Sequence, residues 1–153
     1  MANKIDSIDE QLVTLMGQDA RRSSEAIAKK LGLSAATVRR RLRKLIGSGL
    51  LRIIGVVEPA KFGFSLSVMI ALDVDHDKLD SALDVLINRP EIRWASTTTG
   101  RFDIVALGRF RSADSLSDFL KKELGQISGV RDSETLVCLD VKKGRYVALV
   151  PSD

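Results

Sequence analysis

The chain has 153 residues, 44% hydrophobic and 29% charged, and a net charge of +4, so it can bury one large core or two small ones. No apolar run approaches the length of a membrane span, and the polar, acidic N-terminus does not resemble a signal peptide, so we expect a soluble, cytoplasmic protein. Cys138 is the only cysteine and His76 the only histidine, which excludes an internal disulfide and a Cys and His metal cluster, and we expect no cofactor.

Two short helices are predicted at the start of the chain. The first runs from about Ser7 to Gly17 behind a cap at Asp6 or Ser7. Its apolar residues have helical spacing: Ile5, Ile8, Leu12, Leu15 and Met16. The second runs from about Ser24 to Lys30, and Gly32 follows it in a tight turn.

A third helix, from Ser34 to Ile46, carries most of the local charge. Ser34 is a good N-cap, and one face is apolar: Val38, Leu42, Leu45 and Ile46. Residues 39–44 hold five cations in six positions without an acid among them. Such a run can be a solvated helix surface, but no acid four residues away along the helix stabilises this one.

Two helices joined at a glycine, with cations on the second, are typical of a helix-turn-helix whose second helix enters the DNA major groove. The outward residues nearest its N-terminus would lie closest to base edges: Ala36, Thr37 and Arg40. Ser34, at the helix N-terminus, can meet a phosphate. Other cations are better placed for phosphates, with Arg39 and Arg41 at the margin of the apolar face: Arg21, Lys29, Arg39, Arg41, Arg43 and Lys44.

The basic charge belongs to this half of the chain. Residues 1–60 hold 11 Lys or Arg and 6 Asp or Glu, for a net charge of +5. Residues 61–153 hold 13 and 14, for a net charge of −1. This asymmetry indicates a polyanion bound by the N-terminal half and another task for the rest.

A change of composition after Gly49 marks a domain boundary. The sequence LLRIIGVVEP is rich in β-branched residues and ends in Pro59, which predicts an extended segment. It can be a wing beside the DNA, with Arg52 at a phosphate, or a plain connector. We therefore expect a DNA-binding domain over residues 1–50, a connector strand over 51–62 and a second domain over 63–153.

The second domain shows strands and helices in turn. Residues 64–74 alternate apolar and polar side chains, which predicts a half-buried strand. Further elements follow in the order helix, strand, strand, helix, strand: 79–86, 92–99, 104–110, 112–125 and 135–141. This split βαβ order predicts a ferredoxin-like antiparallel sheet with both helices on one face, and Tyr146–Val150 is a candidate for a final edge strand.

The other sheet face has no helix to cover it. Apolar residues are expected there: Met69, Val137, Leu139 and Val141. A second subunit can cover such a face, so we expect at least a homodimer. The fold class is therefore α+β: an N-terminal helix-turn-helix (winged-helix-like) domain, an extended strand and a C-terminal ferredoxin-like βαββαβ domain.

Taken together, these motifs resemble the Lrp/AsnC family of transcription factors, the leucine-responsive regulatory protein and asparagine-operon regulator family. IDSIDEQLVTL resembles its first helix, and RRSSEAIAKKLGLSAATVRRRLRKLIGSGLL resembles its helix-turn-helix. The run Gly100, Arg101, Phe102, Asp103 resembles the glycine-any-aromatic-aspartate turn of its sensor domain. The resemblance covers nearly the whole chain.

The resemblance implies a sequence-specific regulator that binds promoter or operator double-stranded DNA as a dimer, or as a tetramer or octamer. It also implies control by an amino acid or related metabolite, bound near the turn between the second and third sensor strands. Candidate residues are Thr98, Thr99, Gly100, Phe102 and Asp103. Backbone N–H groups and threonine hydroxyls can bind the carboxylate of an amino acid, and Asp103 can bind its ammonium group. Alternatively, these are simply good hairpin and strand residues.

Two other functions are compatible with the fold. Some decarboxylases of tetrapyrrole synthesis resemble the same family, but His76 lies in a short acidic loop and no nucleophile has a paired base. A metabolite sensor or scaffold that binds no DNA is the second alternative, and it would leave the cations of residues 39–44 without a task.

Overall fold

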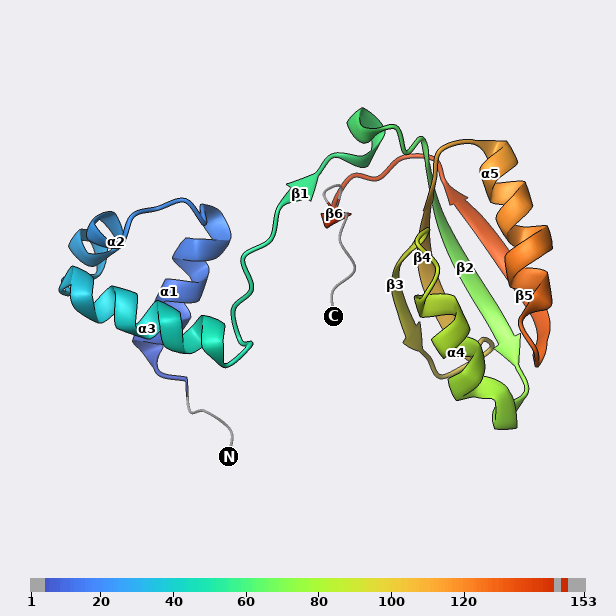
Figure 1. Ribbon diagram of the computed structural model, residues 1–153, viewed down its shortest axis with the longest axis horizontal. Coiled ribbons are helices and arrows are strands. Elements are labelled where there is room, and N and C mark those ends of the chain that lie inside the picture. The colour runs from blue at the N-terminus through green and yellow to red at the C-terminus, as the bar shows by residue number, and fades with distance from the viewer. Residues whose placement is uncertain (1–4, 145–146, 149–153) are drawn as a thin grey trace. The chain divides into compact units, whose positions relative to one another are not determined.

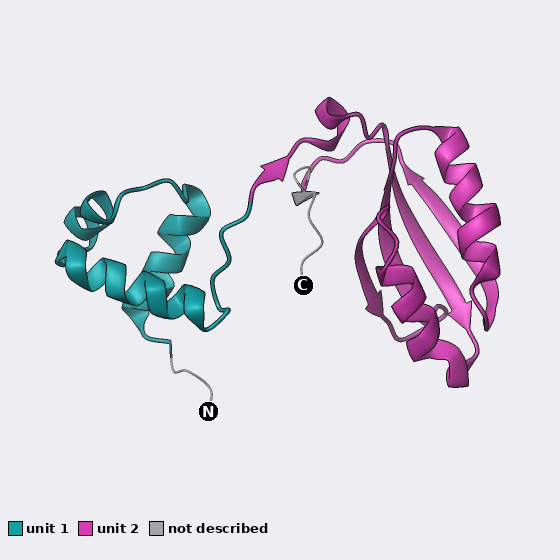
Figure 2. Cartoon of the chain, viewed as in Figure 1, with its two compact units in different colours: residues 1–54 teal, residues 55–153 magenta. Residues whose placement is uncertain are grey.

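The computed structural model describes residues 5–144 and 147–148, and it divides into two compact units (Figure 2). We call them the N-terminal unit, Met1–Ile54, and the C-terminal unit, Gly55–Asp153. The division falls inside the predicted connector.

Three helices make up the described part of the N-terminal unit (Figure 1): α1 (Ser7–Gln18), α2 (Ser24–Leu31) and α3 (Ala35–Gly47). Each begins after a side chain that accepts a hydrogen bond from a first-turn N–H group: Asp6, Ser23 and Ser34. Gly32 ends α2 with φ 65°, a left-handed conformation that glycine adopts without strain. The predicted helix-turn-helix is therefore confirmed.

A small apolar core joins these helices. Its buried residues are Leu12, Leu15, Met16, Ile27, Ala28, Val38 and Leu45. Ala28 is the small residue of α2 where the helices meet, and Val38 faces inward from α3. The apolar side of α3 is thus used for packing, which leaves its other side to the solvent.

The segment after α3 has little regular secondary structure. Residues 51–55 have no regular secondary structure, and a short strand, β1 (Val56–Val57), follows. A 3-10 turn, η1 (Pro59–Phe62), completes the segment. The N-terminal unit contains no strand within its described residues, and the connector over residues 51–62 stays a prediction.

The predicted final edge strand, Tyr146–Val150, differs from its prediction in the strand with which it pairs. Within the described residues it is β6 (Val147–Ala148), which pairs antiparallel with β1 and adds no strand to the main sheet. Tyr146 and residues 149–150 lie outside the described residues. Local sequence could not reveal this partner, because β1 lies about 90 residues earlier in the chain.

The C-terminal unit is built on four antiparallel strands: β2 (Leu66–Val74), β3 (Ile92–Thr97), β4 (Ile104–Phe110) and β5 (Val130–Cys138). Their order across the sheet, β3-β4-β2-β5, is that of a ferredoxin-like fold. Helix α4 (Leu79–Ile87) follows a 3-10 turn, η2 (His76–Lys78), and α5 (Ala113–Asp118) begins at a capping box of Ser112 and Ser115. The predicted α+β class and element order are confirmed.

The helix after β4 is not a single α-helix as predicted. A π-helical turn, η3 (Phe119–Glu123), and a 3-10 turn, η4 (Leu124–Gln126), continue α5. Both turns still bring apolar side chains to the core, Phe119 and Leu124 among them. Apolar spacing alone does not distinguish such variants from a regular helix.

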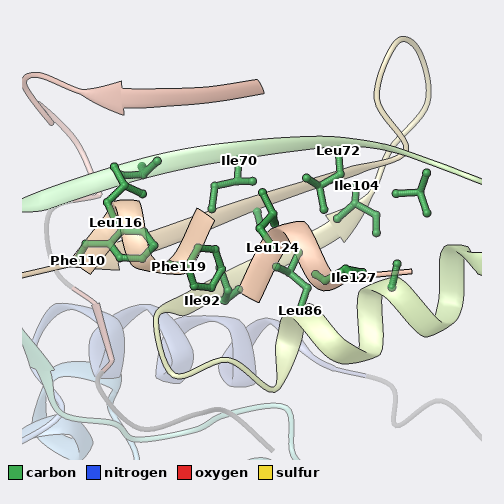
Figure 3. Packing of buried hydrophobic residues seen from close by; sticks show 14 residues of the cluster. Ile70, Leu72, Leu86, Ile92, Ile104, Phe110, Leu116, Phe119, Leu124 and Ile127 are labelled. Atoms are coloured by element: carbon green, nitrogen blue, oxygen red, sulfur yellow. The ribbon is translucent and has the colours of Figure 1, made fainter. Parts of the chain in front are cut away.

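Strand and helix side chains form one core between the sheet and its two helices (Figure 3). Val68, Ile70, Leu72 and Val74 of β2 all face it and are buried. Phe110 and Phe119 meet there with ring centroids 5.2 Å apart. Burying each large side chain contributes roughly 1.5–3 kcal/mol, so this cluster holds the sheet and helices together.

Strand β5 differs from its prediction in both bounds and register. It begins at Val130 rather than at the predicted Thr135. The prediction missed residues 130–134 because they are mostly polar and lack apolar alternation. Leu136, not Val137, lies opposite Met69. A shift of one residue moves every side chain to the other face, so Val137 lies on the helix side.

The open sheet face therefore carries a different apolar set from the predicted one. Leu139 and Val141 lie beyond the end of β5. Strand pairing places one residue from each strand in a single row across this face: Trp94, Leu107, Met69 and Leu136. Trp94 is 52%, Met69 40% and Leu136 51% exposed, so the described structure leaves this row largely open to solvent.

Candidate functional site

The outer face of α3 carries the residues that the sequence assigns to DNA. Most of them are exposed: Ser34, Ala36, Arg39, Arg40, Arg43 and Lys44. Thr37 and Arg41 are half-buried, and Lys29 and Arg21 are exposed outside α3. Ser34 Oγ accepts from the Thr37 N–H at 3.1 Å, which fixes the start of the helix.

Arg41 is held by two acids near the start of α1. Its Nη1 donates to Asp9 Oδ1 at 2.7 Å and to Asp6 Oδ2 at 2.8 Å, and the side chain is 23% exposed. Hydrogen bonds to Asp9 and then Asp6 raise the pKa of Arg41. The Asp9 backbone N–H, followed by Arg41, lowers the pKa of Asp6. Arg41 therefore ties α3 to α1.

Two other predicted contacts are also paired. Arg39 Nη1 lies 2.7 Å from Glu25 Oε1, and Arg21 Nε lies 3.5 Å from Asp19 Oδ1. Both pairs are exposed, so they are weak and compatible with release toward another anion. The cationic run lacks acids along its own helix, but acids from other segments reach it.

Arg40 and Lys44 remain without an ion pair to any residue in the described part of the chain. Together with Asp6, Asp9 and Arg41 they line a hollow of about 190 Å³. Arg43 is exposed and its Nε donates to the Arg39 carbonyl at 3.4 Å. The exposed side of α3 thus presents cations, Arg40 and Lys44, whose charge is not neutralised by an ion pair with a described residue.

In the C-terminal unit, the predicted sensor turn is tied to the end of β2. Val74 N–H donates to Asp103 Oδ2 at 2.9 Å, and Asp103 N–H donates to the Leu72 carbonyl at 2.8 Å. Thr98 Oγ1 donates to the Phe102 carbonyl at 2.7 Å. These bonds bring Thr98, Phe102 and Asp103 together.

Thr99 and Gly100 lie at the exposed tip of this turn. Gly100 has φ 110°, which favours glycine. The Arg101 guanidinium lies over the Phe102 ring, 4.8 Å from its centroid. The Oδ2 atom of Asp103 accepts from β2, while the side chain as a whole is only half-buried, so solvent still reaches this carboxylate.

Sequence reasoning missed charged neighbours of this turn. Arg131, on β5, pairs with Asp73 and, at 3.2 Å, with Asp75. The Arg131 guanidinium lowers the pKa of Asp73. The signal was present as acids at the end of β2, but the late predicted start of β5 left Arg131 outside the sheet.

Comparison with known proteins identifies both units. A model described as the AsnC-type helix-turn-helix domain matches residues 5–46. A model described as the Lrp/AsnC ligand binding domain matches residues 67–147, which is more than half of the chain. The chain belongs to the Lrp/AsnC family. The family identified from the sequence is thereby confirmed.

Several known proteins are similar to this Lrp/AsnC protein over nearly its whole length. An uncharacterised HTH-type transcriptional regulator of Pyrococcus furiosus is 32% identical over 143 residues, which cover 93% of this chain and 97% of the relative. The structure of Escherichia coli AsnC is 26% identical, with a TM-score of 0.84 over 91% of this chain and 95% of that one. A Neisseria meningitidis regulator solved with L-Met is 19% identical, with a TM-score of 0.85 over 93% and 94%, which shows a shared fold.

This Lrp/AsnC protein is therefore a transcriptional regulator with a DNA-binding domain and a ligand-binding domain, and not an enzyme. Its helix-turn-helix has DNA as partner, and its sheet domain has a small-molecule ligand. Among the described residues, no helix has both the length and the apolar character needed to span a membrane.

Proposed function

We propose that this protein is a sequence-specific regulator whose α3 enters the major groove of promoter DNA. The observation that carries the proposal is the exposed charge of Arg40 and Lys44, which form no ion pair with a described residue, on a helix whose N-terminus is capped by Ser34. Helices of this kind read bases with their first outward residues. Binding to DNA also supports the expected cytoplasmic location of the protein.

The proposal divides the cations by their surroundings. Arg40 reads a base, with Ala36 and Thr37 beside it, because a guanidinium can donate twice to guanine. Phosphate contacts are assigned to Ser34, Arg43, Lys44, Lys29 and Arg21. Arg41 acts as a positioning residue because Asp6 and Asp9 hold it, while Arg39 can exchange Glu25 for a phosphate.

Fluorescence anisotropy tests this function. The purified protein is titrated with a duplex from upstream of its own gene and with random duplex, across a series of salt concentrations. We expect tighter binding to the upstream duplex and affinity that falls steeply with salt. No binding at low salt would overturn the proposal.

We further propose that an amino acid or closely related metabolite binds at the turn of residues 98–103. The ligand-binding domain, and the L-Met found in the Neisseria meningitidis structure, support this ligand class. The turn offers hydroxyls, backbone N–H groups and the Asp103 carboxylate, which match the carboxylate and ammonium of an amino acid.

Calorimetric titration of the full chain with amino acids tests the turn. Asp103→Asn keeps an oxygen that can accept from the Val74 N–H while removing the charge. We expect it to weaken ligand binding at least tenfold without weakening DNA binding. Asp84→Asn, an exposed acid on α4, is the control. Equal ligand affinity in Asp103→Asn and wild type would remove this carboxylate from the site.

We also propose that the open sheet face packs against a second copy of the chain. The row of Trp94, Leu107, Met69 and Leu136 supports this, because four apolar side chains crossing one face gain from being covered. A two-fold dimer would pair the same face in both copies and relate the two α3 helices. Tetramers or octamers remain a prediction from the family resemblance.

Sedimentation velocity tests the dimer. Leu136→Asp puts a charge into the row, whereas Val85→Asp changes an exposed apolar residue of α4 on the opposite side of the sheet. We expect the first variant to sediment as a monomer and the second as a dimer. A dimer in both variants would place the subunit contact elsewhere.

A further inference from the structure

Three aspartates lie side by side at the end of the sheet that carries the sensor turn. Asp132 of β5 lies directly opposite Asp73 of β2. The register between β2 and β4 ends at the pair of Leu72 and Ile104, so Asp73 and Asp103 are the next residues of these two segments. Because β4, β2 and β5 are neighbours in the sheet (Figure 1), the three carboxylates form a row across it. We call it the aspartate row.

The carboxylates of the aspartate row are close to one another and open to solvent. The Arg131 guanidinium, and after it the Asp103 side chain, lowers the pKa of Asp73, so the side chains of Asp73 and Asp103 are near neighbours. Both are half-buried, and Asp132 is exposed. Like charges placed opposite one another weaken a sheet, so the row is more stable when positive charge lies beside it.

A β-bulge brings one cation to the row. The register shifts between Asp73 and Val74, which leaves Arg131 as the extra residue of β5. A bulge changes the direction of a side chain, and here the guanidinium pairs with Asp73 and, at 3.2 Å, with Asp75. The two outer carboxylates of the row form no ion pair with a described residue.

The other charged side chains at this end of the sheet do not reverse its sign. Arg101 Nη1 lies 3.8 Å from Glu134 Oε2, and Lys78 Nζ lies 3.5 Å from Asp77 Oδ2. With His76 neutral, three basic side chains stand against six acidic ones: Arg101, Arg131 and Lys78 against Asp73, Asp75, Asp77, Asp103, Asp132 and Glu134. This end of the sheet therefore keeps a net negative charge, which attracts a positively charged ligand.

Findings that do not depend on charge support a ligand at this place. The ligand-binding domain matched over residues 67–147 contains the whole aspartate row. The row also adjoins the turn at which we propose that an amino acid binds, because Val74 N–H donates to Asp103 Oδ2 at 2.9 Å. Asp73 lies four residues beyond Met69 along β2, or about 13 Å at a rise of about 3.3 Å each, so the aspartate row is separate from the apolar row.

The charge of the ligand matters at such a row. An amino acid with an uncharged side chain brings one ammonium group and one carboxylate, so it adds no net positive charge. A side-chain ammonium or guanidinium group adds one, and it can donate to the carboxylates that lack a cation. The outer carboxylates lie on segments two strand spacings apart, about 10 Å at about 4.8 Å each, so a long side chain can extend along the row.

We propose that Asp73 and Asp132 give the amino-acid site at the turn a preference for an amino acid with a cationic side chain. This inference rests on the proposed amino-acid site and deepens it by naming the class of ligand. Asp103 binds the α-ammonium group, and the side-chain cation lies along the aspartate row toward Asp132.

Calorimetric titration of the full-length protein at constant ionic strength tests this preference with matched ligands. L-Arginine is compared with L-citrulline, and L-lysine with L-norleucine, which are similar in length but lack the side-chain charge. We expect at least one cationic ligand to bind at least tenfold more tightly than its uncharged partner. Equal affinities within both pairs would overturn the preference and leave the amino-acid site standing, whereas no saturable binding of any amino acid would overturn both.

Matched variants separate the row from general attraction of cations. Asp132→Asn should weaken binding of the preferred cationic ligand at least fivefold and leave affinity for its uncharged partner unchanged. Asp84→Asn removes the same charge from exposed α4 and should change neither. Equal weakening by Asp84→Asn and Asp132→Asn would overturn the proposed role of the row.

A second copy of the chain is the competing source of positive charge. Sedimentation velocity of Asp132→Asn decides between the two sources. An unchanged assembly together with a reduced preference for the cationic ligand supports the ligand. A dissociated protein, together with no preference for cationic ligands in the wild type, would assign the aspartate row to a subunit contact and overturn the proposal.

Discussion

Two arginines, one in each unit, are withdrawn from water, but their surroundings differ. Arg41 is 23% exposed and donates to carboxylates at 2.7 and 2.8 Å. Arg109 is 5% exposed, and its guanidinium donates to the Ser67 hydroxyl and forms no ion pair with a described residue. A guanidinium neutralised inside its own unit holds the fold together, whereas one without a counter-charge retains donors for a bound group.

The same contrast exists between neighbours on α3. Arg40 and Arg41 are adjacent, yet only Arg41 is reached by the acids of the α1 segment. Burial and partners, rather than residue type, therefore distinguish cations that maintain the fold from cations available to DNA.

Removing an acid that pairs with Arg41 should have the largest effect on stability. Asp9 is buried, accepts from Arg41 and takes part in the capping box of α1. We expect Asp9→Ala to lower the free energy of unfolding by about 2–3 kcal/mol, because charged hydrogen bonds are lost and Arg41 loses a partner. Urea unfolding followed by circular dichroism measures this.

Glu10→Ala is the matched control, because Glu10 is the next residue of α1, is exposed and forms no ion pair with a described residue. Its effect should stay within about 0.5 kcal/mol. Equal losses in both variants would show that the Arg41 pair contributes little.

On DNA, the unpaired cations should divide by role. Arg40→Ala should reduce specific affinity by about 1–3 kcal/mol and relax the preference for one base. Lys44→Ala should weaken all duplexes alike and reduce the salt slope by about 1. Anisotropy against specific and random duplex measures both, with Lys121→Ala as a distant exposed control.

The proposed division would fail if Arg40→Ala and Lys44→Ala lost the same affinity on specific and on random DNA. Arg41→Lys extends the test, because it keeps the charge but loses the guanidinium fork. If Arg41 positions α3 and does not contact DNA, this variant should lower the free energy of unfolding. Its DNA affinity should change less, at temperatures where the unit is folded.

These roles mark how far sequence reasoning reached. Capping residues and apolar spacing are local, so α3 and the alternation of β2 were predicted correctly. The Arg41 pair joins residues 32 and 35 positions apart, and no local pattern reveals it. Nothing in composition distinguished Arg41 from Arg40.

The sheet shows the same limit. Residues 130–134 are mostly polar, as is common on an edge strand, so the start of β5 was missed. The apolar row on the open face depends on strand register, which is set by pairing between distant segments. Arg93 of β3 likewise meets Phe64, before β2, and Arg111, after β4, because β4 lies between β2 and β3 in the sheet.

Removing the charge of Arg109 should have a smaller effect on the free energy of unfolding, in the opposite direction. We expect Arg109→Met to leave the free energy of unfolding unchanged or to raise it by about 1 kcal/mol, because Arg109 forms no ion pair with a described residue and a buried charge is removed. Arg41→Met should instead lower it. Thermal unfolding of the two variants in anion-free buffer is the comparison, and a loss in both would remove the distinction between them.

Acid pH gives the smallest effect, through Asp6. The hydrogen bonds that Asp6 accepts lower its pKa in the folded protein below its ordinary value of 3.8. The unfolded chain therefore binds a proton at a higher pH than the folded chain does, so protonation favours unfolding. The contribution of Asp6 is complete above its ordinary pKa and disappears as pH falls through the lowered folded value.

Melting temperatures of wild type and Asp6→Asn, measured from about pH 6 to about pH 3, test this sign. The variant should be less stable at the upper end, and the two curves should approach each other toward the acid end. Glu10→Gln should run parallel to wild type. Because Asp6 is exposed, added salt should reduce the difference at the upper end, and a constant difference at every pH would show that its charge is not the cause.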